Sequence, residues 1–288
     1  MIGVLYVVAT SIGNLGDIAP RAARIFKEVD FIAAEDTRSA RILLNHLGIS
    51  KKIISCHKYN ERARLEIILN GLLSGMSAAL VSDAGTPCIS DPGHILINEA
   101  AEAGIAVIPV AGPCAVAAAL SVSGFDLRSF AFYGFPPRVM SEIKKTLEDF
   151  KNDSLSVAVF YESPKRIVRF LTIVSEMFPD GDLCICNDLT KKYERIYRGN
   201  AYSVLNEINR NEDREKGEYT VVLRVIKKDK KAAGGDMSAE AMLTDIIINK
   251  NCTLKEAVAL LASEQKHMTK RSIYAASLNL KTKLQSVF

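Results

Sequence analysis

Repeated alternation of short apolar runs with helical patterns constrains the fold of this 288-residue chain most. Four runs of strand length in the N-terminal part are each followed by a segment with helical periodicity. The pairs are 4–9 with 20–28, 29–34 with 39–47, 78–81 with 92–103, and 105–110 with 113–123. Such βα repetition predicts a parallel sheet, and the nearly continuous apolar strands predict helices on both of its faces. We therefore expect an N-terminal α/β domain over residues 1–120.

A second α/β domain is expected over residues 121–228. Its apolar runs and helical segments do not alternate as regularly, and its last strand follows a charged turn, which favours a mixed sheet with a hairpin or edge strand at the end. The expected strands are 130–133, 155–160, 183–187 and 219–226, and the expected helices are 141–150 and 164–177. Proline is tolerated in the first turn of a helix, so Pro164 is expected to open the second of these helices.

A charged, glycine-containing linker over residues 227–235 precedes a small C-terminal helical module, residues 236–288. Its expected helices are 239–248, 254–263 and 270–280; Thr253 and Glu256 have capping-box spacing, and Thr269 can cap the last helix. From residue 265 onward the chain has five basic side chains and no acidic one. Two short helices followed by a basic tail fit either contact with RNA, through Lys270 and Arg271, or a packing role with a solvated tail.

Composition limits the classes of function. The chain is 48% apolar, enough for a sizeable core, and its net charge of +4 is too small for indiscriminate binding of nucleic acid. Six cysteines without a C-x-x-C pair or histidines at zinc spacing predict a reduced, cytoplasmic protein without a metal site. Cys184 and Cys186 are expected on one buried strand face. No run approaches the length of a membrane span, and no signal peptide is recognisable.

The stretch 82–93 is the strongest candidate for a ligand-binding loop. It follows an apolar strand, precedes a helix, and holds two glycines, two prolines and two aspartates within twelve residues. In an α/β sheet, ligands bind beyond the carboxyl ends of the strands, where glycine allows close approach of the backbone. A loop rich in Asx turns is the alternative. The first loop, 10–17, has G-x-x-G spacing but lacks the dinucleotide fingerprint, so an NAD site is not expected.

These strings together resemble a known family. Ser82-Asp83-Ala84-Gly85-Thr86-Pro87-Cys88-Ile89-Ser90-Asp91-Pro92-Gly93 is similar to the signature of the small-subunit ribosomal RNA methyltransferase I family, which has the tetrapyrrole-methylase fold. Four further strings occur in the expected order: 6–17, 34–38, 160–164 and 189–191. The resemblance implies that S-adenosylmethionine is used to methylate the ribose 2′-hydroxyl of a cytidine in 16S rRNA. It also implies a homodimer acting on small-subunit rRNA or on the 30S subunit.

The resemblance also suggests roles for individual residues. The implied cofactor contacts are Gly13, Asp83, Gly85, Thr86, Cys114, Ala115, Tyr161 and Leu189. Arg38 and Arg166 are the expected phosphate or ribose contacts, with a generic surface role as the alternative for either.

Four residues just past the ends of expected strands are candidates for catalysis: Glu35, Asp36, Glu162 and Lys191. Methyl transfer to a hydroxyl requires positioning of the oxygen, exclusion of water and removal of a proton. An acid at such a place is also commonly a helix cap, which is the alternative reading for each carboxylate.

Two other functions remain open at this point. The same fold and cofactor could serve a tetrapyrrole C-methyltransferase, although a macrocycle needs no basic helical module. A non-catalytic RNA-binding ribosome-assembly factor is the third reading. Mass spectrometry of the purified protein for bound S-adenosylmethionine or S-adenosylhomocysteine separates the enzyme readings from the last one.

Overall fold

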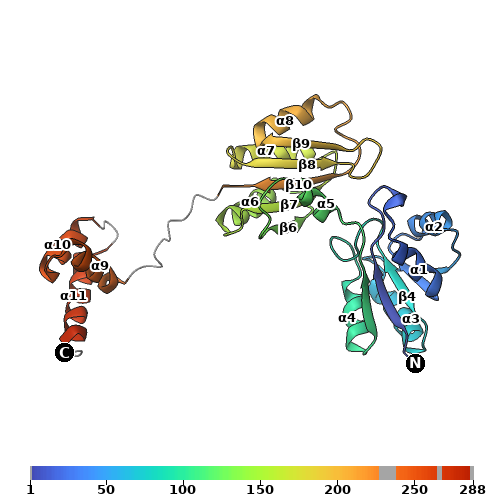
Figure 1. Cartoon of the computed structure of the whole chain (residues 1–288), viewed down its shortest axis with the longest axis horizontal. Coiled ribbons are helices and arrows are strands. Elements are labelled where there is room, and N and C mark those ends of the chain that lie inside the picture. Colours follow the sequence, from blue (N-terminus) through green and yellow to red (C-terminus); the bar gives the residue numbers. More distant parts are fainter. Residues whose placement is uncertain (1, 227–237, 265–267, 286–288) are drawn as a thin grey trace. The chain divides into compact units, whose positions relative to one another are not determined.

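The computed structural model describes residues 2–226, 238–264 and 268–285 and divides the chain into two compact units, 1–226 and 227–288 (Figure 1). The first unit holds two five-stranded sheets, and the second holds three helices. The finer division of the first unit at residue 120 stays a prediction, and the expected linker 227–235 lies outside the described residues.

The first sheet is wholly parallel, as the βα repetition predicts. Its strands lie in the order β3-β2-β4-β1-β5. They are β1 (Val4–Val8), β2 (Phe31–Ala34), β3 (Lys52–Ser55), β4 (Ala78–Val81) and β5 (Ala106–Val110). Sequence analysis missed β3, an edge strand of four residues without a fully buried side chain, and the helix α3 (Glu61–Leu73), whose apolar residues do not form one stripe.

Helices cover both faces of this sheet. On one face α1 (Pro20–Glu28) and α2 (Thr37–His46) pack against alternate strand residues such as Ile32 and Val81. On the other face α3 and α4 (His94–Glu102) pack against the residues between them, such as Phe31 and Leu80. Because successive side chains of a strand point to opposite faces, this two-sided cover favours apolar residues at successive positions of the inner strands β1, β2 and β4.

The second sheet is mixed, as expected, with the order β6-β7-β10-β8-β9. Its strands are β6 (Ala131–Gly134), β7 (Val157–Glu162), β8 (Asp182–Asn187), β9 (Arg195–Asn200) and β10 (Tyr219–Arg224). Only β6 and β7 are parallel. The prediction that the last strand is a hairpin partner or an edge is wrong, because β10 is the central strand and pairs with both β7 and β8. Residues Tyr219 to Leu223 are all buried, which only a central strand covered on both faces requires.

The two faces of the second sheet are covered by different numbers of helices. One face is covered by α6 (Met140–Asn152), α7 (Ile167–Met177) and α8 (Ala201–Arg210), and the other by α5 (Ala115–Ser121), which packs over the buried Cys184 and Cys186. The helix that the βα pattern attaches to the first sheet therefore packs on the second. The expectation that Pro164 opens a helix is also wrong: residues 164–166 form a turn, and α7 begins at Ile167, whose N–H donates to Ser163 O.

The C-terminal unit has a small core of its own. Its helices are α9 (Ala239–Lys250), α10 (Leu254–Glu264) and α11 (Lys270–Gln285). The side chains of Leu243, Leu261 and Ile273 pack between them. The predicted capping box is confirmed, since Thr253 N donates to Glu256 Oε2 at 2.8 Å and Glu256 N to Thr253 Oγ1 at 3.4 Å. In the parts of the chain that the structure describes, no helix combines the length and the apolar character that crossing a bilayer would take.

Candidate active site

The loops that follow β1, β2 and β4 meet at one edge of the first sheet, because parallel strands all end there. Thr10 N donates a hydrogen bond to Gly85 O at 2.8 Å, and Gly85 N donates to Ser11 O at 3.3 Å. Asp36 N, just past β2, donates to Asp83 Oδ1 at 3.1 Å. The three loops therefore form one hydrogen-bonded layer above the sheet.

The loop 82–93 has a backbone that requires glycine. Gly85 has φ of +75°, a conformation that other residues rarely adopt, and a Cβ there would lie 3.2 Å from Ile12 Cγ2. The hydroxyl of Thr86 donates to Pro113 O at 3.0 Å, so the loop is also fixed to the segment that follows β5. These contacts explain why the glycine and the threonine occur together in the string 82–93.

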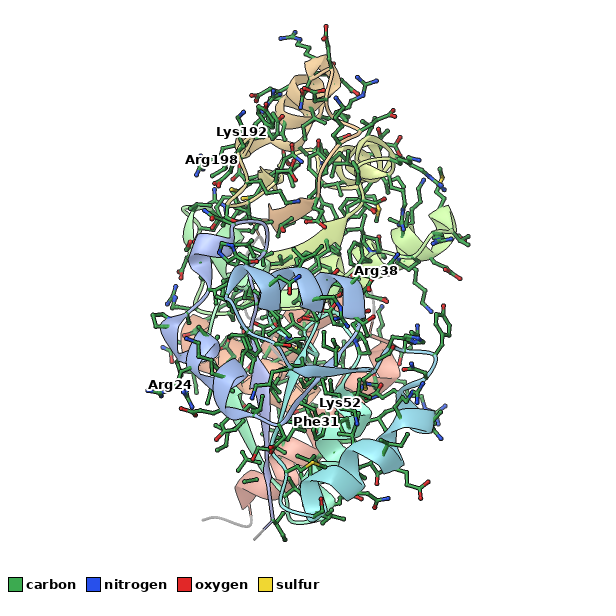
Figure 2. All side chains as sticks on the ribbon, turned by 90° about the vertical axis from the view of Figure 1, so that its right-hand side faces the viewer. Arg24, Phe31, Arg38, Lys52, Lys192 and Arg198 are labelled. Atoms are coloured by element: carbon green, nitrogen blue, oxygen red, sulfur yellow. The ribbon has the colours of Figure 1, made fainter. Side chains whose placement is uncertain are left out.

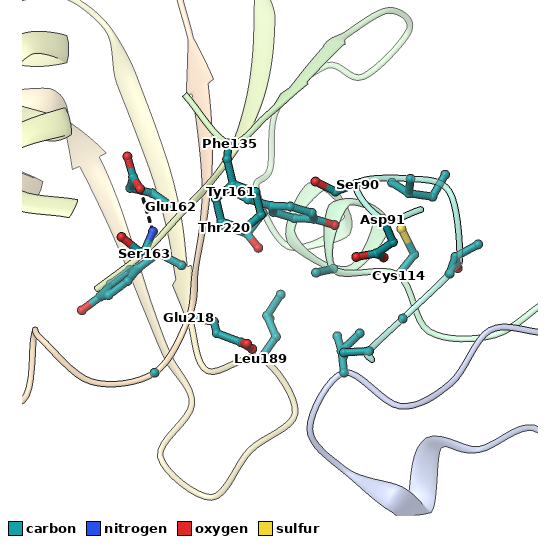
Figure 3. Close-up of a pocket in the computed structure, with 18 of the residues that line it drawn as sticks. Ser90, Asp91, Cys114, Phe135, Tyr161, Glu162, Ser163, Leu189, Glu218 and Thr220 are labelled. Atoms are coloured by element: carbon teal, nitrogen blue, oxygen red, sulfur yellow. Dashed lines mark hydrogen bonds between the residues drawn. The ribbon is translucent and has the colours of Figure 1, made fainter. Parts of the chain in front are cut away.

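A cavity of about 450 Å³ lies between these loops and the carboxyl-end loops of the second sheet (Figure 3). The second sheet contributes Tyr161 and Glu162 at the end of β7, Leu189 after β8, and Glu218 before β10. The start of an antiparallel strand lies beside the end of its neighbours, so the residues before β10 reach the same edge. The volume is within the range of about 300–1,000 Å³ usual for small-molecule sites.

The cavity combines aromatic and acidic walls. Phe135 and Tyr161 have ring centroids 5.6 Å apart, and the carboxylates are those of Asp91, Glu162 and Glu218. Among the described residues that line it, none is Lys, Arg or His. The remaining lining residues are Ile12, Ala84, Gly85, Thr86, Ile89, Ser90, Cys114, Ala115, Ser163, Pro164, Leu189, Gly217, Tyr219 and Thr220. Carboxylates and aromatic faces both favour a positively charged ligand.

The carboxylate of Glu162 is buried and lies beside the guanidinium of Arg166. Its side chain is 0% exposed, its Oε1 accepts from Ser163 N at 2.7 Å, and its Oε2 lies 3.2 Å from Arg166 Nη2 without hydrogen-bond geometry. Burial raises the pKa of Glu162, and the Ser163 hydrogen bond and Arg166 oppose that rise. Arg166 Nη2 also donates to Pro136 O and Pro137 O, both at 2.7 Å. The guanidinium thus connects the cavity wall to the turn that carries Phe135.

Glu35, Asp36, Asp83 and Asp91 form an acidic group beside this cavity. Burial, followed by the charges of Asp91 and Asp83, raises the pKa of Glu35, whose Oε2 is buried without a hydrogen-bond partner. Asp36 differs, because hydrogen bonds from Arg38 lower its pKa to about 2. Asp36 Oδ1 accepts from Arg38 N at 2.8 Å and caps α2. In the described part of the chain, no group of three or more potential ligands has the arrangement of a metal site.

Lys191 crosses from the second sheet to the first loop. Its ammonium contacts Asp188 Oδ1 at 2.8 Å and Glu218 Oε2 at 3.0 Å. Burial alone would lower the pKa of Lys191, but these two carboxylates outweigh it and raise the pKa. The aliphatic stem covers Gly13 so closely that a Cβ there would overlap Lys191 Cγ. Gly13 and Lys191 are therefore together at the margin of the cavity without lining it.

The residues selected from the sequence fall into three groups. Six of the suggested cofactor contacts line the cavity: Gly85, Thr86, Cys114, Ala115, Tyr161 and Leu189. Asp83 does not, and lines a smaller cavity with Thr10. Arg38 is 87% exposed at the start of α2 (Figure 2), with its guanidinium on its own neighbour Asp36. Lys270 and Arg271 are exposed at the start of α11, in the other unit.

Sequence analysis missed Phe135, Asp91 and Glu218 as lining residues. Asp91 lies inside the string 82–93, so the loop itself was the available signal. Phe135 precedes a Pro-Pro pair, and Glu218 precedes a strand that was expected at an edge. Neither has a local pattern that indicates a binding role.

Comparison with known proteins agrees with this architecture. The family model of the Tetrapyrrole (Corrin/Porphyrin) Methylases matches residues 4–205, which hold the whole first sheet and every strand of the second sheet except β10. A protein of Vibrio cholerae serotype O1 named "Ribosomal RNA small subunit methyltransferase I" is 39% identical over 272 residues, covering 94% of this chain and 93% of its own. Proteins of the same name from Escherichia coli O157:H7 (37% identity, 96% and 95% covered) and Halalkalibacterium halodurans (45%, 68% and 68%) are also similar.

Residues 4–205 thus have the fold of the tetrapyrrole methylases. The chain belongs to the ribosomal RNA small subunit methyltransferase I family. The resemblance found from the strings 6–17 and 82–93 is confirmed.

The Glu162–Arg166 pair generates a stability prediction. Removing one partner of a buried ion pair costs about 3–5 kcal/mol, so Arg166→Ala should destabilise the protein by about that amount near pH 8. Without Arg166 the pKa of Glu162 rises further, so the penalty is absent below the unfolded pKa, grows as the pH rises from the unfolded pKa toward the folded one, and is fully present above the folded pKa. Urea unfolding at pH 5 and pH 8 measures this, and the loss should be smaller at pH 5.

Two further variants sharpen the test. Arg166→Ala combined with Glu162→Gln removes the unpaired charge and should recover part of the lost stability. Lys165→Ala, at an exposed neighbour, is the matched control and should change little. An equal loss for Arg166→Ala at both pH values would show that packing and the Pro136 and Pro137 contacts, rather than the buried charge, dominate.

Proposed function

We propose that this protein uses S-adenosylmethionine to methylate the ribose 2′-hydroxyl of a cytidine in 16S rRNA of the small ribosomal subunit. The observation that carries the proposal is the similarity to proteins named ribosomal RNA small subunit methyltransferase I over more than nine-tenths of both chains. Ribose as the acceptor and cytidine as the nucleoside rest on the resemblance of the strings 34–38, 82–93 and 160–164.

The residues of the 450 Å³ cavity fit this cofactor. The cofactor carries a positive sulfur and an ammonium group, and the cavity offers aromatic faces and the carboxylates of Asp91 and Glu218. Glu218 also contacts Lys191, and the carboxylate of Glu162 is fully buried against Arg166. Gly85, Thr86, Cys114 and Ala115 would hold it from the first sheet, and Tyr161 and Leu189 from the second. When bound, S-adenosylmethionine supplies a methyl group that the positive sulfur makes electrophilic.

Among the candidate catalytic residues, Glu35 suits proton removal best. Its pKa is raised, and its buried Oε2 has no hydrogen-bond partner, so the carboxylate can take the proton of a hydroxyl placed beside it. Asp36 caps a helix and has a pKa of about 2, which makes it a weak base. Glu162 is held by Ser163 and Arg166.

Lys191 has a different role in the proposal. Its raised pKa keeps the ammonium charged at neutral pH, so it cannot accept a proton. Its stem covers Gly13, and its charge lies between Asp188 and Glu218. We assign it to fixing the first loop against the second sheet, which excludes water from the margin of the cavity.

RNA contact is assigned to basic side chains outside the acidic cavity. Arg38 is exposed at the edge where the loops of the first sheet gather, and Lys270 and Arg271 are exposed in the C-terminal unit. The ion pair between the exposed Arg38 and its neighbour Asp36 is weak, so Arg38 can exchange that partner for a phosphate at little cost.

The expected reaction product tests the proposed function directly. Purified protein, labelled S-adenosylmethionine and either free 16S rRNA or 30S subunits from a strain lacking this enzyme should yield labelled 2′-O-methylcytidine. Nuclease digestion followed by mass spectrometry of the nucleosides identifies it. Label on a base carbon, on another nucleoside or on neither RNA would reject the assignment, and comparison of the two substrates shows which one is used.

Glu35→Gln tests the assignment of the base. The wild-type rate of a single turnover should fall as the pH drops through the raised pKa of Glu35, because only the carboxylate accepts a proton. The amide should lower the rate by about 10²–10⁴-fold and remove that limb of the pH profile. Stability should not fall, because the variant removes a buried charge. Glu66→Gln, on the exposed side of α3, is the control; a wild-type rate and profile in Glu35→Gln would exclude Glu35 as the base.

The C-terminal unit generates a prediction about salt. If its basic side chains contact phosphates, log affinity for RNA should fall by roughly 0.7–0.9 per log unit of salt for each phosphate neutralised. Truncation after Ile226 should leave cofactor affinity nearly intact, weaken binding of the subunit and flatten this slope. Lys270→Glu with Arg271→Glu should do so in part. An unchanged slope and rate in the truncated protein would assign the unit to packing or regulation.

We also propose a cytoplasmic homodimer. The support is the fold family together with the frequency of two-fold assemblies among soluble oligomers. Sedimentation at micromolar concentration should give twice the chain mass of 31.5 kDa. A sedimentation coefficient typical of the single chain would contradict this.

A further inference from the structure

A second cavity of about 230 Å³ lies beside the first and has no role in the function proposed so far. The same two loops line both cavities. Ile12 and residues 84–86 face the larger one, whereas Thr10, Ser11, Ser82 and Asp83 line the smaller one. The hydrogen bonds that join residues 10 and 11 to Gly85 therefore run along the partition between the two cavities.

The polar groups of this second cavity are suited to a neutral ligand that both donates and accepts hydrogen bonds. Thr10 is only 3% exposed, and its hydroxyl has no hydrogen-bond partner. Such a buried polar group is costly, and a ligand that supplies a partner removes the cost. Ser11, Ser39 and Ser82 bring further hydroxyls, and the one charged group in the lining is the carboxylate of Asp83.

The remaining walls are apolar, which suits the faces of an aromatic ring. They are formed by Leu15, Ala40, Ile42, Leu43 and Val81, and Ile42 is 66% exposed at the surface. The volume is below the range of about 300–1,000 Å³ typical for larger ligands, so it suits a single base with its sugar outside. The carboxylate disfavours a phosphate.

We propose, building on the function proposed above, that this second cavity receives the base of the acceptor cytidine and that Asp83 accepts a hydrogen bond from its exocyclic amine. A carboxylate that accepts from the amino group is the usual protein contact for cytosine. Uracil presents a carbonyl oxygen at the same position, which a carboxylate repels. The hydroxyls can donate to the other ring acceptors of cytosine.

This placement of the base is compatible with proton removal by Glu35. Proteins that recognise RNA by sequence commonly take an unstacked base into such a cavity, and the ribose then stays at its mouth. Asp83 is close enough to Glu35 to raise its pKa, and Asp83 Oδ1 accepts from Asp36 N. A base held by Asp83 thus brings its ribose toward Glu35.

Binding of short RNA strands tests the proposal without relying on activity. The full-length protein, saturated with S-adenosylhomocysteine, should bind a fluorescent hexamer of cytidine about tenfold more tightly than a hexamer of uridine in anisotropy titrations at one salt concentration. Asp83→Asn should remove this preference, because the amide oxygen stays with Asp36 N and the NH2 group then faces the base, where it can donate to uracil but cannot accept from cytosine. Asn keeps an oxygen for Asp36 N, and affinity for S-adenosylhomocysteine should not change.

Two variants complete the design. Thr10→Val keeps the shape of the buried side chain and should weaken binding of the cytidine strand. Asp17→Asn, an exposed residue of the same first loop that does not line the cavity, should keep the tenfold preference. The proposal is overturned if the wild type does not prefer cytidine, if Asp83→Asn keeps the preference, or if Asp83→Asn instead loses affinity for S-adenosylhomocysteine.

The outcome is separable from that of the proposed function. Formation of 2′-O-methylcytidine with a preference that does not depend on Asp83 would reject the base-binding cavity and leave the reaction standing. A preference that depends on Asp83, without that product, would support the cavity and reject the proposed reaction.

Discussion

The hydrogen-bonded contact between residues 10 and 11 and Gly85 is the interaction on which the candidate site depends. It exists because β1 and β4 are neighbouring parallel strands, so the loops that leave them emerge side by side. Gly85 makes the contact possible, since its φ of +75° turns the loop back toward Ile12. Residues at this contact line both cavities, so a change in its geometry alters both cavities together.

Negative charge is the second constraint, and it has a cost. Burial raises the pKa of both Glu35 and Glu162, so holding either carboxylate ionised at neutral pH destabilises the folded state. Glu162 has Arg166 at 3.2 Å, whereas the described residues give the buried Oε2 of Glu35 no hydrogen-bond partner. This difference is the basis for proposing Glu35, rather than Glu162, as the base.

The sequence predicted what depends on local pattern. Four strands of the first sheet, the loop 82–93 and the caps at Thr253 and Thr269 follow from periodicity, glycine and short polar residues, whereas the edge strand β3 and the helix α3 have no such pattern. The position of β10 does not follow from a local pattern, because its place between β7 and β8 depends on pairing with strands far along the chain. Glu218 reaches the cavity only through that pairing, and Phe135 only through the pairing of β6 with β7, so no pattern around either residue indicated a role.

The acidity of the cavity implies that attraction of RNA must come from elsewhere. Asp91, Glu162 and Glu218 repel phosphates at close range, and the net charge of +4 gives only a weak overall attraction. Exposed cations at Arg38, Lys270 and Arg271 can supply that attraction without entering the cavity. Because exposed charges are screened by salt and buried ones much less so, added salt should reduce affinity for RNA far more than affinity for the cofactor. In the proposed function, exposed basic side chains therefore hold the RNA and the acidic cavity holds the cofactor.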